Sequence, residues 1–389
     1  MKILVVTTFY PEKDRNDLIQ DTSVVHYFTK EWVKEENEVV VLHLYAHNFK
    51  NIMKYKLKKY GKMQEEKIID GVKVYIMENQ FFKRNAKRYL KVQQKHIANE
   101  INKLLKTKLK DFNPDALVVH FPSHFEGIIE NLDLNCKKFA TFHITDCNSL
   151  KVNKKSRKII KNTYNHFIAR SNSIKNIMNS IEYNPEFVAN SGIDSSIIIK
   201  KEELENKHNT KLKVLYAGSF IKRKNVDVII KALGQVKNKI DFEFIIIGDG
   251  KNANMLKELA VENKIDDKCA FLGRKQRKEV FDYMKQSDIF VMVSSNETLG
   301  LTYMEAMSQG CLTIGSLNEG IDGIIKNNQN GFLIEAGNVE QLAELIIRIN
   351  EMTDTEKKKI QKNAILTINE MTSEKTAQNY INFIKSKIN

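Results

Sequence analysis

The chain has 389 residues, of which 42% are hydrophobic and 28% are charged, and its formal net charge at pH 7 is +14. This chain is longer than a typical domain with a single hydrophobic core, so we expect two domains. No apolar run is long enough to span a bilayer, and residues 1–7 are too short for the apolar core of a signal peptide. The four cysteines lack metal-ligand spacing, which favours reduced thiols in the cytosol over a disulfide framework.

The positive charge is concentrated in the N-terminal half. Residues 1–200 hold 34 Lys and Arg against 22 Asp and Glu, a difference of +12, whereas residues 201–389 hold 28 against 26, a difference of +2. In 54–60 and 81–90, basic residues alternate with aromatic and apolar ones. Such a pattern can bind an anionic membrane surface, which we favour over nucleic acid as the partner; a merely solvated helix face is the simplest alternative.

Apolar strands alternate with amphipathic helical stretches along the chain. The strands expected in the N-terminal half are 3–8, 39–44, 72–77, 116–120, 138–143 and 166–170. Turn residues interrupt the pattern near 184–194, and a second series follows. Its expected strands are 213–218, 242–247, 269–272, 289–293 and 312–314. This alternation predicts doubly wound, mostly parallel sheets.

We therefore predict an α/β chain with two Rossmann-like, doubly wound domains. The first covers 1–188 and the second 189–370, and a final helix in 371–389 is expected to pack back on the first domain. Ligands of this architecture bind outside the carboxyl ends of the strands, so we expect the site in a central cleft that the two domains face.

Two carboxylates, Glu297 and Glu305, bracket the segment that follows the expected strand 289–293. A strand that passes through a short turn into a helix exposes N–H groups that, with the helix dipole, attract an anion such as phosphate. A carboxylate can accept hydrogen bonds from two adjacent hydroxyls, so Glu305 suits a ribose and Glu297 a sugar. Glutamates at this spacing also occur by chance, but Gly300 allows backbone to approach a ligand closely, which favours a nucleotide-sugar site.

A second loop, 216–225, ends a strand with Gly218 and then supplies Lys222, Arg223 and Lys224. A fixed lysine beside a leaving nucleoside diphosphate stabilises the charge that develops as the bond to the sugar breaks. The alternative is a loop of solvated cations. No two aspartates are separated by a single residue, so an Asp-x-Asp metal clamp is not available and we expect neither a metal nor another cofactor.

The order and spacing of motifs over the C-terminal half resemble the retaining glycosyltransferases of family four. The matching segments are 217–224, 246–250, 271–274, 287–291, 295–310 and 330–333, with the Glu-x7-Glu signature at Glu297 and Glu305. This resemblance implies the GT-B fold, with the nucleotide sugar held mainly by the C-terminal domain and the acceptor mainly by the N-terminal one.

Carried over position by position, the resemblance implies that Glu297 contacts the donor sugar, Glu305 the ribose and Lys224 the diphosphate. His143, in a His-x-x-Asp element, would touch the donor sugar or its developing charge. The other donor-side residues implied are Gly218, Ser219, Arg223, Gly248, Arg274, Thr298, Leu299, Gly300 and Leu301. The acceptor-side candidates are Tyr10, Asp21, Thr22, Ser23, His26, His120 and Asp146.

The chain departs from the family pattern in several places. Ser219 stands where an arginine is common, so Arg223 or Lys222 would supply that charge. Leu299 replaces a common aromatic residue, and 318–323 replaces a glycine pair in what we expect to be a flexible loop. The glycine pair usual after the first strand is absent from 21–26, which weakens the expected backbone contact with the diphosphate.

The sequence thus predicts a retaining, metal-independent glycosyltransferase that uses a UDP- or GDP-sugar. Its acceptor would be a saccharide or a lipid-linked molecule in cell-surface polysaccharide or glycolipid synthesis, which places it in the cytoplasm, at the inner face of the cell membrane. The alternatives are a sugar-nucleotide epimerase, which needs no acceptor, a phosphorylase, which needs inorganic phosphate, and a non-catalytic binding or scaffold protein of the same fold.

Overall fold

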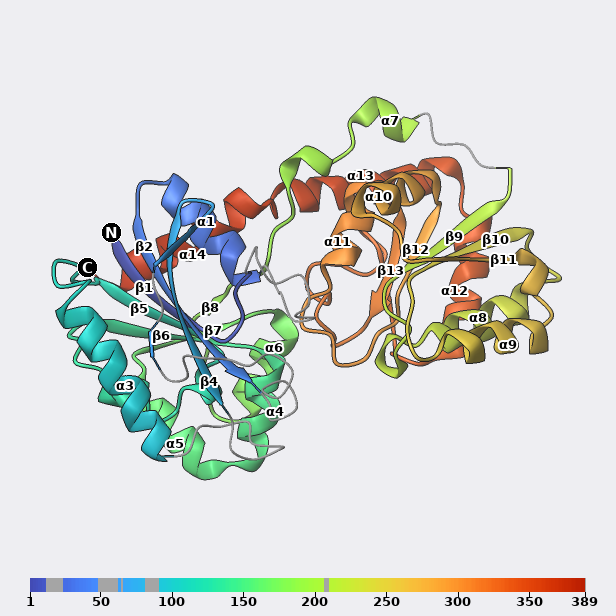
Figure 1. Cartoon of the computed structure of the whole chain (residues 1–389). Helices are drawn as coiled ribbons and strands as arrows, with labels where there is room; N and C mark the ends of the chain where they lie inside the picture. Colours follow the sequence, from blue (N-terminus) through green and yellow to red (C-terminus); the bar gives the residue numbers. More distant parts are fainter. Residues whose placement is uncertain (12–23, 48–61, 64–65, 81–90, 206–209, 389) are drawn as a thin grey trace. The chain divides into compact units, whose positions relative to one another are not determined.

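The computed structural model describes residues 1–11, 24–47, 62–63, 66–80, 91–205 and 210–388 (Figure 1). The chain forms two compact units: Met1–Ser191 with Ser373–Asn389, and Gly192–Thr372. The basic stretches 54–60 and 81–90 lie outside the described residues. Within the described ranges, no helix is long and apolar enough to cross a membrane.

The first unit is built on an eight-stranded sheet with the order β3-β4-β2-β1-β5-β6-β7-β8. Its strands are β1 (Lys2–Thr7), β2 (Glu38–His47), β3 (Lys67–Ile69), β4 (Val72–Gln80), β5 (Ala116–His120), β6 (Lys137–Phe142), β7 (His166–Ala169) and β8 (Phe187–Val188). All neighbours pair in parallel except β3 and β4. Because β1 lies between β2 and β5, the strand order reverses beside β1, and open α/β sheets bind ligands at such a switch point.

Helices cover both faces of this sheet (Figure 1). They are α1 (Val24–Lys34), α3 (Lys91–Lys106), α4 (Ile144–Val152), α5 (Lys154–Thr163), α6 (Asn172–Ser180) and α14 (Ser373–Ile388). Leu4 and Val6 belong to a core shared with α3, α4, α5 and α6. Ile3 and Val5 belong to a second core with α1 and α14. Successive strand residues point to opposite faces, so a sheet covered on both sides needs the continuous apolar strands that this sequence has.

The second unit is a six-stranded parallel sheet with the order β11-β10-β9-β12-β13-β14. Its strands are β9 (Leu212–Ala217), β10 (Phe242–Ile247), β11 (Cys269–Gly273), β12 (Ile289–Val291), β13 (Leu312–Ser316) and β14 (Phe332–Ile334). Its helices are α7 (Lys201–Glu205), α8 (Val226–Val236), α9 (Ala253–Glu262), α10 (Arg277–Gln286), α11 (Leu301–Ser308), α12 (Val339–Glu351) and α13 (Asp354–Asn369). The switch point of this sheet lies between β9 and β12.

The predicted fold class, α/β with two doubly wound units, is confirmed. The expected strands 116–120 and 242–247 coincide with β5 and β10, and the ends of the others differ by one to three residues. Three strands were missed: β3, β8 and β14. They are only two or three residues long, too short to show a period in the sequence.

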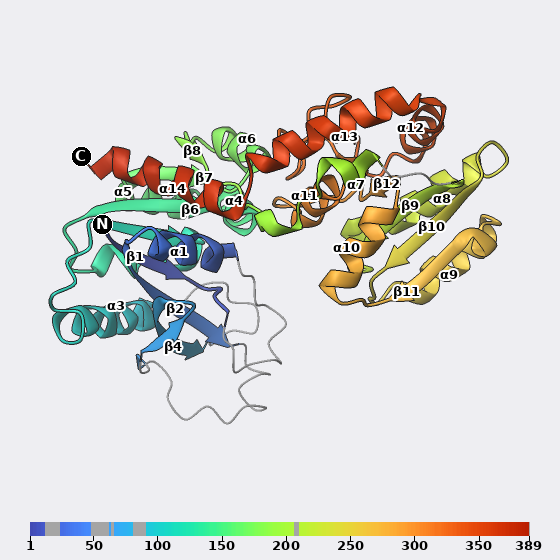
Figure 2. The ribbon, with the colours of Figure 1, turned by 90° about the horizontal axis from the view of Figure 1, so that it is seen from above.

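The C-terminal helix α14 packs against α1 as part of the first unit (Figures 1 and 2). Tyr380 on α14 is fully buried, and its ring centroid lies 5.2 Å from that of Phe28 and 5.1 Å from that of Trp32. The hydroxyls of Tyr380 and Thr141 hydrogen-bond at 2.5 Å. The last helix therefore completes a core whose other members come from the beginning of the chain.

Truncating Tyr380 should destabilise the first unit. Tyr380→Ala removes a buried aromatic ring and should cost about 3 to 5 kcal/mol of unfolding free energy. Tyr380→Phe leaves the Thr141 hydroxyl without its partner and should cost about 1 to 3 kcal/mol. Urea unfolding followed by circular dichroism measures both, with the exposed Lys385→Ala on the same helix, expected to change stability by less than about 0.5 kcal/mol, as the control. Equal stability of all three variants would contradict this packing.

Candidate functional site

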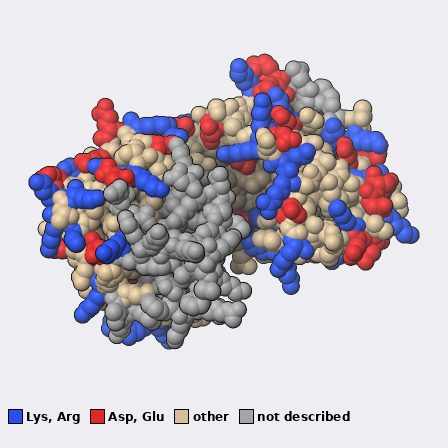
Figure 3. Space-filling view, viewed as in Figure 1, with Lys and Arg blue, Asp and Glu red and all other residues tan. Residues whose placement is uncertain are grey.

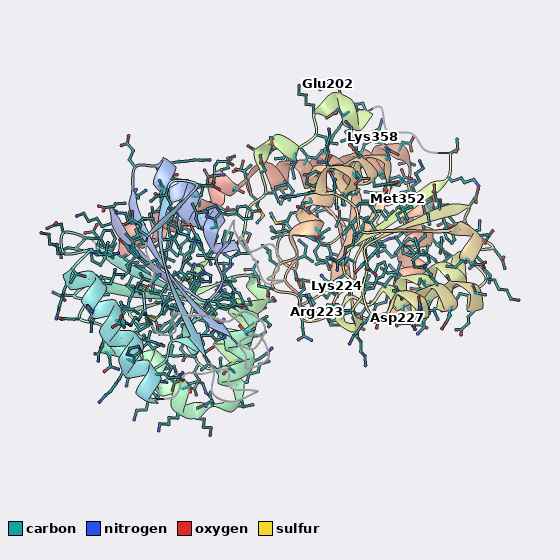
Figure 4. The ribbon with its side chains drawn as sticks, viewed as in Figure 1. Glu202, Arg223, Lys224, Asp227, Met352 and Lys358 are labelled. Carbon is teal, nitrogen blue, oxygen red and sulfur yellow. The ribbon has the colours of Figure 1, made fainter. Side chains whose placement is uncertain are left out.

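Lys224 and Glu297 meet at the switch point of the second unit. Lys224 ends a short 3-10 helix, η4 (Lys222–Lys224), that follows β9, and Glu297 lies in the loop after the neighbouring strand β12. The Lys224 Nζ lies 2.5 Å from Glu297 Oε2, and Arg223 Nη1 lies 3.1 Å from the same oxygen. Figure 4 shows Arg223 and Lys224 together at this end of the unit. The side chains of Lys224 and Glu297 are each 12% exposed, so a largely desolvated ion pair lies where α/β sheets bind ligands.

The cations keep Glu297 ionised. Burial raises the pKa of its carboxyl, but Lys224 and then Arg223 outweigh burial, and the net pKa lies below the ordinary value of 4.5. Because the pKa of Glu297 is lower in the folded than in the unfolded state, its ionisation stabilises the fold. This stabilisation is fully present above the pKa of the unfolded state and is lost as the pH falls through the pKa of the folded state. Glu297 is therefore a hydrogen-bond acceptor at neutral pH.

Hydrogen bonds join the two loops that carry this ion pair. The Ser295 N–H donates to the Arg223 carbonyl at 2.7 Å. Asn225 Nδ2 donates to the Val293 carbonyl at 2.7 Å and to the Ser295 hydroxyl at 3.1 Å. These three hydrogen bonds join the loop of Lys224 to the loop of Glu297. The surrounding structure therefore holds both side chains in place.

Glu319 fixes the backbone at Glu297. Its carboxylate accepts the N–H of Asn296 at 2.9 Å and that of Glu297 at 2.7 Å. The next residue, Gly320, passes so close to this loop that a Cβ there would lie 2.4 Å from the Leu299 nitrogen. Residues 318–323 were expected to form a flexible loop. This contact was not predicted, because a lone glutamate beside a glycine has no spacing that points to its partner.

Gly300 starts helix α11 beside Glu297. It has a φ of 77°, and a Cβ there would lie 2.6 Å from the Tyr303 ring, so both the backbone and the space available require glycine. The Tyr303 hydroxyl donates to the Met292 carbonyl, which ties the first turn of α11 to the end of β12. Leu299 is buried at 4% exposure and packs in the core. The first-turn N–H groups of such a helix have no intrahelical partner and attract anions.

Glu305 lies on the same helix and is 13% exposed. Its Oε1 accepts a hydrogen bond at 2.7 Å from Nη2 of Arg277, the first residue of α10, which is 56% exposed. Sequence reasoning did not identify Arg277, since the two residues are 28 positions apart in the chain. A carboxylate has about four lone-pair sites, so Glu305 can still accept hydrogen bonds from a ligand.

The other donor-side candidates lie on the loops after β9, β10, β11 and β12. The Gly218 N–H donates to the Ile247 carbonyl and the Gly248 N–H to the Gly273 carbonyl, each at 2.9 Å, so three of these loops are cross-linked. Of these candidates, Ser219 and Arg274 are exposed, and Gly218, Gly248, Thr298 and Leu301 are partly exposed. In the part of the chain that the structure describes, no three His, Cys, Asp or Glu side chains gather into a group that could hold a metal ion.

In the first unit, His120 and His143 meet at the carboxyl ends of β5 and β6. His120 Nδ1 and His143 Nε2 are 3.2 Å apart, and both side chains are buried. Burial lowers the pKa of both well below the ordinary 6.5. Arg170 lowers the pKa of His120 further, and His120, then Arg170 and His124, lower that of His143 further. Both imidazoles are therefore neutral at neutral pH.

Phe121 stacks against both His143 and His124. The ring centroids of Phe121 and His143 are 3.6 Å apart, and those of Phe121 and His124 are 5.7 Å apart. Phe121 has a φ of 62°, which is strained for a bulky residue, and such strain gathers at functional sites. His124 Nδ1 lies 3.0 Å from the Thr8 hydroxyl, so the loops after β1 and β5 meet at the switch point. Neither Phe121 nor His124 was among the candidates from sequence.

Asp146, expected on the acceptor side, is fully buried. It accepts hydrogen bonds from the Ser123 N–H at 2.9 Å, the Ser123 hydroxyl at 2.6 Å and the His143 N–H at 2.8 Å. Burial raises the pKa of this carboxyl to about 6, against the effect of these bonds. The side chain thus positions the turn that carries His143, and in this conformation it is not exposed to an acceptor.

Tyr10 and His26 are also internal. Tyr10 is 1% exposed, and its hydroxyl contacts the Thr29 hydroxyl at 2.7 Å and His26 Nδ1 at 2.9 Å. His26 Nε2 lies 2.9 Å from the Asp70 carboxylate. These two candidates therefore tie the loop after β1 to α1. The remaining acceptor-side candidates, Asp21, Thr22 and Ser23, lie outside the described residues.

Comparison with known proteins gives the fold of the chain and a family match for part of it. The chain has the GT-B fold: it aligns with a lipopolysaccharide outer core galactosyltransferase, WaaB, at a TM-score of 0.70 and 16% identity over 100% of both chains. It also aligns with HepE of Anabaena in complex with UDP and glucose at a TM-score of 0.65 and 14% identity over 99% of this chain and 100% of that one. Residues 198–367 match the family "Glycosyl transferases group 1". This match covers 170 of the 389 residues and lies within the second unit.

A curated relative extends the match beyond this domain. An uncharacterized glycosyltransferase of Methanocaldococcus jannaschii is 28% identical over 232 residues. The alignment covers 59% of this chain and 63% of the relative, so the chain spans less than two thirds of the relative's length. Glu297, Glu305 and Lys224 all lie within the segment that matches the family.

Removing the Lys224 charge should raise the pKa of Glu297. In Lys224→Met, burial is opposed by Arg223 alone, so Glu297 should titrate at a higher pH than in the wild-type protein, where its pKa lies below 4.5. Carboxyl carbon NMR over an acid titration measures this value. Lys222→Met, an exposed lysine of the same loop, is the matched control and should leave the titration unchanged. Identical titration of Glu297 in all three proteins would show that the ion pair does not form.

Proposed function

We propose that this protein transfers a sugar from a nucleoside-diphosphate sugar, UDP- or GDP-linked, to a saccharide or lipid-linked acceptor, with retention of the anomeric configuration and without a metal ion. The Lys224–Glu297 pair, beside the N-terminus of α11, carries the proposal. It combines a cation for a leaving diphosphate, a carboxylate for sugar hydroxyls and a helix end for an anion.

Lys224 is suited to stabilise the leaving group. An ammonium group has three N–H donors, so Lys224 can keep one on Glu297 and direct another to a phosphate oxygen. Because negative charge grows on the diphosphate as the bond to the sugar breaks, a fixed cation stabilises the transition state more than the ground state. Ser219 stands at the position where the family commonly has an arginine. Arg223, whose Nη1 lies 3.1 Å from Glu297 Oε2, would supply this second cation instead.

Glu297 and Glu305 divide the donor between them in this proposal. Glu297 is ionised and anchored by its backbone to Glu319, so it can accept hydrogen bonds from the hydroxyls of the transferred sugar. Glu305 would accept the ribose hydroxyls. Its partner Arg277 is more than half exposed, so it can move aside or contact the nucleotide itself.

His143 has a different part in this proposal. As a neutral imidazole it can exchange hydrogen bonds with a sugar hydroxyl without bringing a full charge to the reaction. The proton of the acceptor hydroxyl would pass to the leaving phosphate, because none of these residues is arranged as an obvious carboxylate nucleophile or base for it.

The acceptor belongs to cell-surface polysaccharide or glycolipid synthesis in this proposal, and the protein would work in the cytoplasm, at the inner face of the cell membrane. Two observations support it: the structural neighbour WaaB acts in the lipopolysaccharide outer core, and the net charge of residues 1–200 is +12 from 34 basic and 22 acidic residues. An anionic membrane surface attracts such a chain.

The two glutamates should fail in different ways. A panel of nucleotide sugars, screened by thermal shift, identifies the donor, because a ligand that binds the native state raises its stability. With that donor, Glu297→Ala should lower kcat by roughly 100- to 1000-fold, as loss of a transition-state contact does. Glu305→Ala should instead raise the KM for the donor by roughly 10- to 100-fold, as loss of a charged hydrogen bond does.

The exposed Glu258→Ala on α9 is the matched control and should change neither constant. Unchanged turnover of Glu297→Ala would refute the role of this residue. If no nucleotide sugar shifts the melting temperature of the wild-type protein, the proposed function is wrong.

The stereochemistry and the metal requirement are tested together. Turnover should be unaffected by EDTA, because Lys224 and the α11 N-terminus supply the positive charge that a metal would. Proton NMR of the early product should show the anomeric configuration of the donor. An inverted product, or activity that EDTA abolishes and a divalent cation restores, would overturn that part of the proposal.

A further inference from the structure

Helix α5 and the end of α4 carry a dense set of exposed cations on the first unit. The set, here called the α4–α5 surface, consists of Lys151, Lys154, Lys155, Lys158 and Lys161, with the apolar Val152 among them. Figure 3 shows basic side chains along the lower margin of this unit, where Figure 1 places α5. This surface has no part in the donor site and was not among the sequence predictions.

Acidic residues are almost absent from this part of the chain. No Asp or Glu occurs between Asp146 and Glu182, and Asp146 is itself fully buried. Of the five lysines, only Lys161 pairs with a carboxylate of the described residues, that of Glu182, at 3.5 Å. Glu182 is 80% exposed, so this pair is weak. The surface therefore keeps nearly all its positive charge.

The cations are held on a rigid element. Ile160 and Ser156 on the inner side of α5 are 1% and 0% exposed, so the helix is anchored to the unit and its lysines face outward. Between α4 and α5 the chain turns at Asn153, whose side chain accepts the Ser156 N–H at 3.0 Å. Val152, just before this turn, is 87% exposed. An apolar side chain thus projects from the middle of the basic set.

We propose that the α4–α5 surface docks the protein on an anionic lipid bilayer, with the lysines at the headgroups and Val152 inserted between them. Basic residues near an anionic leaflet are attracted to it, and an apolar side chain gains by leaving water at the interface. This proposal names the surface through which the membrane location in the proposed function would be reached.

The chemistry of the surface favours lipid over nucleic acid. Proteins that bind single strands use aromatic rings on which bases stack, but residues 144–163 contain no Phe, Tyr or Trp. The one exposed non-polar group is the branched Val152, which has no role on a phosphate backbone. The lysines would attract both nucleic acid and an anionic bilayer, but only the bilayer offers an apolar environment for Val152.

The position of the surface fits an acceptor held in the membrane. Helix α4 begins directly after His143 and has nine residues, so its far end lies about 14 Å along the helix axis from His143, which contacts His120. Docking through this end would bring the carboxyl ends of β5 and β6 close to the lipid headgroups. This step rests on the proposed function, whereas the docking itself does not.

Co-sedimentation of the full chain with vesicles tests the docking. Vesicles of phosphatidylcholine with about 30% phosphatidylglycerol should bind the protein at low salt, and pure phosphatidylcholine vesicles should not. The triple variant K154Q/K155Q/K158Q should bind the anionic vesicles at least about tenfold more weakly. Val152→Ser should weaken binding severalfold in about 0.5 M salt, where charge attraction is screened and the apolar contact remains.

The matched control is K239Q/K264Q/K359Q, which removes three exposed lysines from the second unit and should bind as the wild type does. If the two triple variants bind anionic vesicles equally well, the proposal is wrong. It is also wrong if K154Q/K155Q/K158Q loses more of its binding to duplex RNA than of its binding to vesicles. A thermal shift measured with the donor separates the two proposals. If the protein does not bind vesicles, only the docking is refuted; if the donor does not raise the melting temperature, only the proposed sugar transfer is refuted.

Discussion

The ion pair between Lys224 and Glu297 is the contact on which the candidate site of the second unit depends. Two opposite charges that are each 12% exposed stabilise one another because water does not solvate them fully. Removing one partner leaves the other as a buried charge, so the pair is strong only while both loops keep their places. The bonds from Asn225, Ser295 and Glu319 provide that constraint. The attraction between Lys224 and Glu297 therefore depends on the rigidity of these loops.

The first unit also buries a cation, and among its described residues no carboxylate forms an ion pair with it. The Arg170 guanidinium is fully buried, donates to the Ala189 carbonyl and the Ser191 hydroxyl, and lies 4.9 Å from the Phe28 ring centroid. Burial lowers the pKa of His120 and of His143, and the charge of Arg170 lowers both further, so both imidazoles stay neutral. The same topological feature, a switch point beside the first strand, thus carries an ion pair in one unit and uncharged imidazoles in the other.

The sequence was sufficient for the features that repeat along the chain. Continuous apolar strands between amphipathic helices predicted both sheets, since a sheet buried on two faces needs such strands. Glu297 and Glu305 were found because a fixed spacing joins them across the start of one helix. Arg277 and Glu319 were missed because each meets its partner only after the chain has folded, 28 positions from Glu305 in one case and 22 from Glu297 in the other.

Phe121 shows the other limit, because a left-handed φ at an aromatic residue has no signal in one sequence. Asp146 was identified by its motif, but its burial depends on Ser123, which lies on a different loop. Contacts of this kind decide whether a polar residue faces a ligand or holds a turn. Motif spacing gives the identity of such residues, and only the packing of neighbouring loops gives their orientation.

Solvent exposure separates the two kinds of charge in this protein. Interactions between exposed charges are screened over about 8 Å at physiological salt, whereas buried pairs are screened much less. The Lys224–Glu297 pair belongs to the second kind, and the lysines of the α4–α5 surface belong to the first. Ionic strength should therefore act on the basic surface of the first unit and leave the donor site almost unchanged. The proposed donor contacts would thus be insensitive to salt, and the proposed membrane contacts would be sensitive to it.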